Sequence, residues 1–202
     1  MSIRNIVFDI GNVFVRWAPE EIIRLTFGLN CDKGEISPEL FQSAIWKSLN
    51  KGEITEGDAS LKYQNEFNWS NEDCQRFFYY VKATQLEIYG TFELAIQLKE
   101  AGYSLYALTD NVNEIVDFLK RTFEFWPIFD GTTVSAEVGI LKPAPEIYRK
   151  LLSMHGITAS ETVFIDDMPY NIEGAESQGI AGIQFSSADQ CAQDLRDMGV
   201  NF

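Results

Sequence analysis

From residue 91 onward, the sequence alternates between short apolar segments and longer amphipathic ones, and this alternation constrains the fold more than any other feature. The apolar segments contain few polar residues, which is typical of strands buried on both faces. In the amphipathic segments, apolar residues recur at helical spacing and glycines such as Gly102 and Gly156 mark the ends. Strands separated by helices predict a parallel sheet covered on both faces, a Rossmann-like three-layer α/β/α core. Helices are expected within 91–103, 113–121, 145–156, 169–179 and 187–199, and strands within 5–9, 103–110, 126–135, 162–167 and 180–185.

Residues 16–88 differ from this pattern, because they are rich in charged and aromatic side chains and carry no strand signal. Apolar residues recur at helical spacing in 37–50 and again in 70–88. We therefore expect a helical-bundle cap inserted into the α/β core, which would comprise residues 1–15 and 89–202. Most of the aromatic side chains are expected to form the interior of this cap.

The acidic balance of the chain limits its partners. A count of 30 Asp and Glu against 16 Lys and Arg gives a formal net charge of -14. Nucleic acid and anionic membrane surfaces would be repelled at long range, so we expect neither as a partner. No apolar run approaches the ~18 residues of a membrane span. Three cysteines without metal-site spacing favour reduced thiols in a cytoplasmic protein: Cys31, Cys74 and Cys191.

Oxygen-bearing side chains stand at the ends of three expected strands. Asp9 ends the first strand, Thr109 ends "LYALT", and Asp166 and Asp167 end "VFIDD". Ligands of a parallel sheet bind outside the carboxyl ends of its strands, so these side chains should meet at one edge. Such oxygen ligands suit Mg²⁺, which would offset the repulsion between the clustered carboxylates.

These motifs, in this order, resemble those of the haloacid dehalogenase-like hydrolase superfamily, and the resemblance covers nearly the whole chain. It is closest to the branch with a small helical cap and to sugar-phosphatase-like members with a D-x-G-N-V motif. The resemblance implies that Asp9 in "VFDIGNV" is a nucleophile that forms an aspartyl-phosphate. It also implies that Thr109 in "ALTDN" binds the phosphoryl group, that Lys142 in "ILKPAPEIY" is the third element, and that Asp166 and Asp167 hold Mg²⁺.

The implied activity is Mg²⁺-dependent hydrolysis of small phosphorylated metabolites, including sugar phosphates. Mg²⁺ would be held by Asp9, the backbone carbonyl of Gly11 and Asp167, with or without Asp166. Lys142 would supply a positive charge to the phosphoryl oxygens and keep Asp9 ionised. The residues expected to contact the substrate are Asn12, Trp17, Thr109, Asp110 and Asn171.

One position departs from the common phosphatase pattern D-x-D, because Gly11 stands where the second Asp would protonate the leaving group. A carbon–halogen bond needs no such acid, so a 2-haloacid dehalogenase using Asp9 as its nucleophile is an alternative. Such dehalogenases lack the paired acid and usually have Asp where Asn171 stands, which favours the phosphatase. Asp110 adds a negative charge near the phosphate, so a protein that binds a phosphorylated metabolite without turnover is a further alternative.

Overall fold

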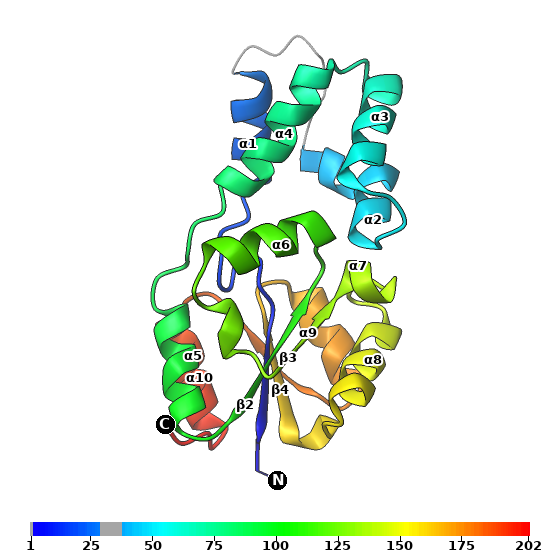
Figure 1. Cartoon of the computed structure of the whole chain (residues 1–202). Coiled ribbons are helices and arrows are strands. Elements are labelled where there is room, and N and C mark those ends of the chain that lie inside the picture. The colour runs from blue at the N-terminus through cyan, green and yellow to red at the C-terminus, as the bar shows by residue number, and fades with distance from the viewer. Residues whose placement is uncertain (1, 29–37) are drawn as a thin grey trace.

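A central sheet of five parallel strands organises the chain, whose computed structural model describes residues 2–28 and 38–202 (Figure 1). The strands are β1 (Asn5–Phe8), β2 (Ser104–Thr109), β3 (Gly131–Val134), β4 (Thr162–Asp166) and β5 (Ala181–Gln184). The α-helices are α1 (Pro19–Phe27), α2 (Ala44–Asn50), α3 (Glu56–Phe67), α4 (Asn71–Ala83), α5 (Thr91–Glu100), α6 (Asn113–Thr122), α7 (Ser135–Val138), α8 (Pro145–His155), α9 (Pro169–Glu176) and α10 (Ala188–Asp197). Short 3-10 helices are η1 (Pro38–Gln42), η2 (Trp126–Ile128) and η3 (Ala159–Glu161).

The strand order is β3-β2-β1-β4-β5, which places β1 at the centre of the sheet. Phe8, the last residue of β1, lies opposite Ala107 of β2 and Ile165 of β4. Asp9 follows Phe8 and Asp166 follows Ile165, so the two residues lie at the same level along the sheet. The register therefore brings two of the expected carboxylates side by side at the carboxyl edge.

The two faces of the sheet pack against different helices, because successive side chains of a strand point to opposite faces. Ile6 and Phe8 of β1 belong to an apolar core that includes side chains of α5, α6 and α10. Val7 belongs to a second apolar core with α8 and α9. Figure 1 shows α5 and α10 on one side of the sheet and α8 and α9 on the other. The expected three-layer α/β/α core with a parallel sheet is confirmed.

Helices α1 to α4 and η1 lie together beyond the carboxyl ends of the strands (Figure 1). The chain enters and leaves this group through two adjoining segments, 14–16 and 86–88, which we call the neck. In the neck, Val15 forms an antiparallel bridge with Glu87, and Arg16 N donates to Leu86 O at 2.8 Å. The cap predicted over residues 16–88 would have both of its ends at the neck, and this division of the chain stays a prediction. Its buried aromatic side chains include Phe41, Trp46, Tyr63, Trp69, Phe77 and Phe78.

The helix expected within 70–88 is shorter than its apolar spacing predicts. It begins after Ser70, whose side chain accepts from Asp73 N in a capping box, and it ends at Ala83. Beyond that point the side chain of Gln85 donates to Val81 O of α4, and Ile88 N donates to Phe14 O on the other segment of the neck. A long-range backbone pairing therefore replaces the last turn of the expected helix.

Two further segments differ from the sequence pattern. The helical spacing of 37–50 is interrupted at Ser43, which caps the N-terminus of α2 by accepting from Trp46 N. The residues after β3, for most of which the sequence pattern predicted no element, form the short helix α7. Cys74 and Cys191 are buried free thiols, and Cys31 lies outside the described residues. Among the helices of the described ranges, none has the length and apolar character to cross a membrane.

Candidate active site

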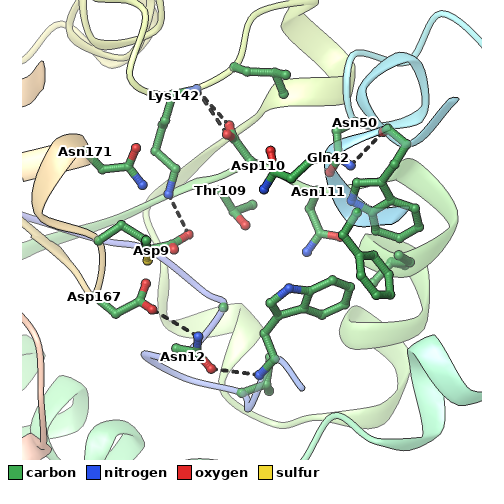
Figure 2. A pocket seen from close by; sticks show the side chains of 18 of the residues that line it. Asp9, Asn12, Gln42, Asn50, Thr109, Asp110, Asn111, Lys142, Asp167 and Asn171 are labelled. Atoms are coloured by element: carbon green, nitrogen blue, oxygen red, sulfur yellow. Dashed lines mark hydrogen bonds and ion pairs between the residues drawn. The ribbon is translucent and has the colours of Figure 1, made fainter. Parts of the chain in front are cut away.

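Four segments of the core deliver the candidate catalytic side chains to the carboxyl edge of the sheet (Figure 2). Asp9 follows β1 directly, and its backbone N donates to Ile165 O at 2.8 Å. Thr109 is the last residue of β2 and Asp166 is the last residue of β4. Lys142 comes from the loop between α7 and α8. The site is therefore assembled from segments that are distant in sequence and adjacent in the sheet.

Lys142 bridges two of these carboxylates. Its Nζ lies 2.9 Å from Asp9 Oδ1 and 2.7 Å from Asp166 Oδ2, and it donates to Leu108 O at 3.4 Å. Only 8% of the residue is exposed. Burial opposes the positive charge, but Asp9, Asp166 and Asp110 together hold the pKa of Lys142 above its ordinary value. The lysine is thus a fixed cation beside Asp9 and Asp166.

Asp166 is fully buried and its carboxylate is held from several directions. Met168 N donates to Oδ1 at 2.8 Å, and Asn171 Nδ2 donates to Oδ1 at 3.0 Å and to Oδ2 at 3.1 Å. The Tyr148 hydroxyl donates to the Asn171 backbone carbonyl at 2.7 Å. Asn171, which the sequence suggested as a substrate contact, therefore uses its side-chain nitrogen to orient Asp166.

Asn12 connects the loop after β1 to the other acid of the pair. Its backbone φ is 54°, a left-handed conformation that Asn tolerates better than most residues. Its Nδ2 donates to Asp167 Oδ2 at 3.0 Å, and its Oδ1 accepts from Trp17 N at 2.9 Å. Burial raises the pKa of Asp167, and the hydrogen bond from Asn12 opposes that shift. Asn12 thus positions a carboxylate and the start of the cap at the same time.

Asp110 also has a partner within the protein. Its two carboxylate oxygens accept from the backbone N of Lys142 at 3.0 and 3.1 Å. Burial raises the pKa of Asp110 to about 6, although Lys142 opposes this shift. This contact ties the loop after β2 to the loop that carries the lysine.

The carboxylates suit a hard divalent cation. Oxygens of Asp9, Asp166 and Asp167 all lie within 4.8 Å of one another. Burial raises the pKa of Asp9 to about 8 although Lys142 lowers it, so a single lysine does not compensate the buried negative charge. Oxygen donors at this spacing fit Mg²⁺, and a bound cation would lower the pKa of Asp9. The backbone carbonyl of Gly11 accepts no hydrogen bond from the described residues and is free to add a ligand.

A cavity of about 430 Å³ opens above these side chains, between the core and the cap. It is bounded by most of the expected site residues: Asp9, Gly11, Asn12, Trp17, Thr109, Asp110, Lys142, Asp167 and Asn171. Asp166 is not among the lining residues and lies beneath the surface of the cavity. The proposed nucleophile and the proposed substrate contacts therefore face one common space, with Asp166 behind them.

The cap side of this cavity contains residues that sequence reasoning missed. They are Gln42, Trp46, Lys47, Asn50 and Gln85, with Asn111 from the core. Ser135 of α7 connects the two sides, because its Oγ donates to Asn50 O at 2.6 Å and accepts from Asn111 N at 2.9 Å. These residues belong to no motif, and their proximity depends on how the cap docks. Only the helical spacing of the cap, which predicted buried positions, hinted at some of them.

Comparisons with known proteins give matches that extend over most of the chain. Residues 3–179 match the family of haloacid dehalogenase-like hydrolases. A sesquiterpene phosphatase from Aspergillus oryzae is 25% identical over 192 residues, which cover 95% of this chain and 94% of that protein. Flavin mononucleotide hydrolase 1 from Arabidopsis thaliana is 27% identical over 204 residues, covering 97% of this chain and 78% of that protein. The crystal structure of a HAD family enzyme from Bacteroides thetaiotaomicron, in complex with magnesium and inorganic phosphate, superimposes with a TM-score of 0.80 at 22% identity, covering 92% of this chain and 96% of that chain.

Proposed function

This chain belongs to the haloacid dehalogenase-like hydrolase family, and from that premise we propose that it is a Mg²⁺-dependent phosphatase of small phosphorylated metabolites. The observation that carries this proposal is the contact of Lys142 with Asp9 inside a cluster of three carboxylates at the floor of a cavity. The cluster can hold a divalent cation beside the nucleophile, and the lysine adds a second positive charge. Of two relatives that match most of the chain, one is named a phosphatase and the other a hydrolase of flavin mononucleotide, which supports the same chemistry.

The reaction we propose has two displacement steps at phosphorus. A carboxylate oxygen of Asp9 forms a bond to phosphorus as the bond to the leaving alkoxide breaks, which gives an aspartyl-phosphate and, after protonation, an alcohol. Water then attacks the phosphorus, releases inorganic phosphate and restores the carboxylate. The pair of displacements needs mainly alignment and charge neutralisation, because the phosphoryl group carries most of the charge.

The side chains would share these tasks. Lys142 would neutralise the phosphoryl oxygens, and the hydroxyl of Thr109 would donate to them. Asp167, with Asp9, the Gly11 carbonyl and the buried Asp166 behind them, would hold Mg²⁺, which supplies Lewis-acid stabilisation of negative charge when bound. Asn12, Trp17, Asp110 and Asn171 stay proposed substrate neighbours, and for three of them the hydrogen bonds described above add a positioning role.

The cap, proposed over residues 16–88, would cover the leaving-group end of the substrate, since it supplies one side of the cavity. Dehalogenation with the same nucleophile is the rival chemistry. The three-carboxylate cluster favours the phosphatase, because displacement of a halide requires no cation beside the nucleophile. Binding of a phosphorylated metabolite without turnover would use the same residues.

A screen of phosphomonoesters and 2-haloacids, each with Mg²⁺ and with EDTA, tests the proposal. We expect phosphate release that depends on Mg²⁺ and disappears in Asp9→Asn, because an amide neither attacks phosphorus nor serves as an anionic ligand. The variant should keep the wild-type circular dichroism spectrum. Halide release that is insensitive to EDTA would assign the protein to the dehalogenases. Binding of a phosphomonoester by the wild type without hydrolysis would assign it to the proteins that bind such a metabolite without turnover.

A further inference from the structure

The Asp110 carboxylate lies one lysine residue away from the proposed nucleophile. Its two oxygens accept from Lys142 N at 3.0 and 3.1 Å, and the other end of the same lysine, Nζ, lies 2.9 Å from Asp9 Oδ1. Asp110 also follows Thr109 directly, and both residues line the cavity. Figure 2 shows Thr109, Asp110 and Lys142 around the same end of the cavity. A phosphoryl group held by Lys142 and Thr109 would therefore have the Asp110 carboxylate as a neighbour.

No positive side chain of the described ranges is paired with Asp110. Within residues 2–28 and 38–202, Lys142 N is the one donor to its oxygens, and no Lys, Arg or His nitrogen forms an ion pair with it. Lys142 Nζ pairs instead with Asp9 and Asp166. Burial raises the pKa of Asp110 to about 6 and Lys142 opposes that shift, so the group is mostly ionised at neutral pH. Asp110 thus brings an unpaired negative charge to the cavity.

The hydrogen bond from Lys142 N does not require this charge. The amide oxygen of an asparagine would accept from the same N–H. Nor does Lys142 need Asp110 in order to stay protonated. Asp9 and Asp166 lie within ion-pair distance of its Nζ and raise its pKa more strongly than Asp110 does. The position of the loop and the protonation of the lysine therefore leave the negative charge of Asp110 unexplained.

The balance of charge at this end of the cavity gives the carboxylate a role. Asp9, Asp166 and Asp167 form a cluster of three carboxylates, whose charge a divalent cation and Lys142 together would neutralise. Asp110 adds a further carboxylate, so one negative charge remains in excess. That excess opposes a phosphoryl dianion, whether the dianion belongs to the ester or to inorganic phosphate.

The ester also has its leaving group to hold it in the cavity, whereas inorganic phosphate has only the charges and hydrogen bonds at this end. We propose that the Asp110 carboxylate keeps the site from retaining inorganic phosphate, because it repels the dianion that hydrolysis leaves behind. This inference rests on the proposed phosphatase function and names how that site releases its product. The same charge weakens binding of the ester, since it acts on both dianions.

Replacement of Asp110 by Asn removes the charge and keeps an acceptor for Lys142 N. Calorimetry with inorganic phosphate and Mg²⁺, at about pH 8 where Asp110 is ionised, measures the effect. We expect Asp110→Asn to bind phosphate about tenfold more tightly than the wild type does. The inhibition constant of phosphate and the KM of an ester should fall with it, without a rise in kcat, because ester and transition state gain alike.

The direction of the change separates repulsion from a purely structural role. A residue that only positioned Lys142 would weaken phosphate binding when replaced. Asp117→Asn, at an exposed position of α6 outside this cavity, is the matched control, because it also removes one carboxylate charge and should leave phosphate binding unchanged. If Asp110→Asn does not fold, Asp110→Ser, which also keeps a neutral acceptor, decides alone. Phosphate binding in the folded variant that equals the wild-type value or is weaker would overturn the inference.

Because calorimetry requires no turnover, it also separates this inference from the proposed function. Tighter phosphate binding by Asp110→Asn, in a protein that hydrolyses no phosphomonoester, would remove the phosphatase proposal and leave Asp110 as the group that weakens phosphate binding. Hydrolysis by the wild type, together with unchanged phosphate binding in the variant, would overturn the inference alone.

Discussion

Lys142 Nζ lies 2.9 Å from Asp9 Oδ1, and both side chains are almost completely buried. The lysine also lies 2.7 Å from Asp166 Oδ2, so it shares one charge between two carboxylates. One lysine therefore does not neutralise this region, because the negative charge of the carboxylate cluster exceeds the positive charge that the protein supplies there. A phosphate ester could not approach such a cluster without further positive charge, which is why the proposed function includes a cation.

Replacement of Lys142 by Met should abolish detectable turnover and destabilise the fold. Asp9 and Asp166 would lose their buried partner, and removal of one member of a buried ion pair costs about 3–5 kcal/mol of unfolding free energy. Urea unfolding and phosphate release measure the two effects. Lys150→Met, at an exposed position of α8, should change neither. Unchanged stability in Lys142→Met would show that the buried pair is not formed in solution.

In the acid pair, Asp167 should be the more important metal ligand, and Asp166 should contribute more to the stability of the fold. Asp167→Ala should raise the Mg²⁺ concentration needed for half-maximal activity more than Asp166→Ala does, because the Asp167 side chain lines the cavity. Asp166→Ala should cost more stability, since it removes the acceptor for Lys142, Asn171 and Met168 N. Mg²⁺ titrations of activity and urea unfolding of both variants test this. The reverse order in the titration would mean that the ligands are misassigned.

Gly11 should make the rate depend on the leaving group. The aryloxide of an aryl phosphate such as p-nitrophenyl phosphate leaves without protonation, whereas the alkoxide of an alkyl phosphate needs a proton. General acid catalysis is worth about 10²- to 10⁴-fold. Gly11→Asp should narrow this gap. The turn accepts a side chain, because a Cβ would lie 3.9 Å from Trp17 Cβ and the backbone is not left-handed. A series of esters assayed on both proteins gives the dependence of the rate on the pKa of the leaving group. A rate that does not depend on this pKa in the wild type would reveal another general acid.

The pKa of Asp9 predicts how stability changes with pH when metal is removed. Burial holds the folded carboxyl protonated to about pH 8, whereas the unfolded chain loses this proton near its ordinary pKa of 3.8. The folded state therefore carries the extra proton between these values, and the free energy of unfolding should fall as pH rises through that window. The slope contributed by this group is at most about 1.4 kcal/mol per pH unit.

Urea unfolding in EDTA across that window measures the effect. Asp9→Asn cannot bind this proton, so its stability should fall less steeply than that of the wild type. Added Mg²⁺ should stabilise the wild type more at the upper end of the window than at the lower end. Parallel curves for the two proteins would contradict the assigned pKa shift.

The core was predictable because its signals are local. The apolar runs around Phe8 and Phe164 predicted buried strands, and helical spacing with glycine ends predicted α5, α8 and α10. The cap was less predictable, because helix ends there depend on long-range contacts. The segment after Ala83 has helical spacing, yet its backbone pairs with residues near Phe14.

The candidate site divides in the same way. Residues that end strands, such as Asp9 and Asp166, were identified because the strand pattern and the family motifs coincide there. Asn50 and Gln85 were not, because an amide in a helical segment carries no sign of the cavity it will face. The contact of Asn12 with Asp167 was also beyond the sequence, since it requires the register between β1 and β4. The contact of Asn171 with Asp166 depends instead on how α9 packs against the end of β4.

Because of the neck, the proposed cap could be exchanged as a single unit. Its two segments pair as neighbouring strands do, so the points at which the chain leaves and re-enters the core are about 5 Å apart. A graft at these points would exchange the cap side of the cavity and leave Asp9, Lys142 and the Asp166–Asp167 pair covalently undisturbed. A transplanted cap would have to respect one close approach, because Gly52 packs so tightly on the carbonyl of Ala136 that a Cβ would lie 2.1 Å from its oxygen.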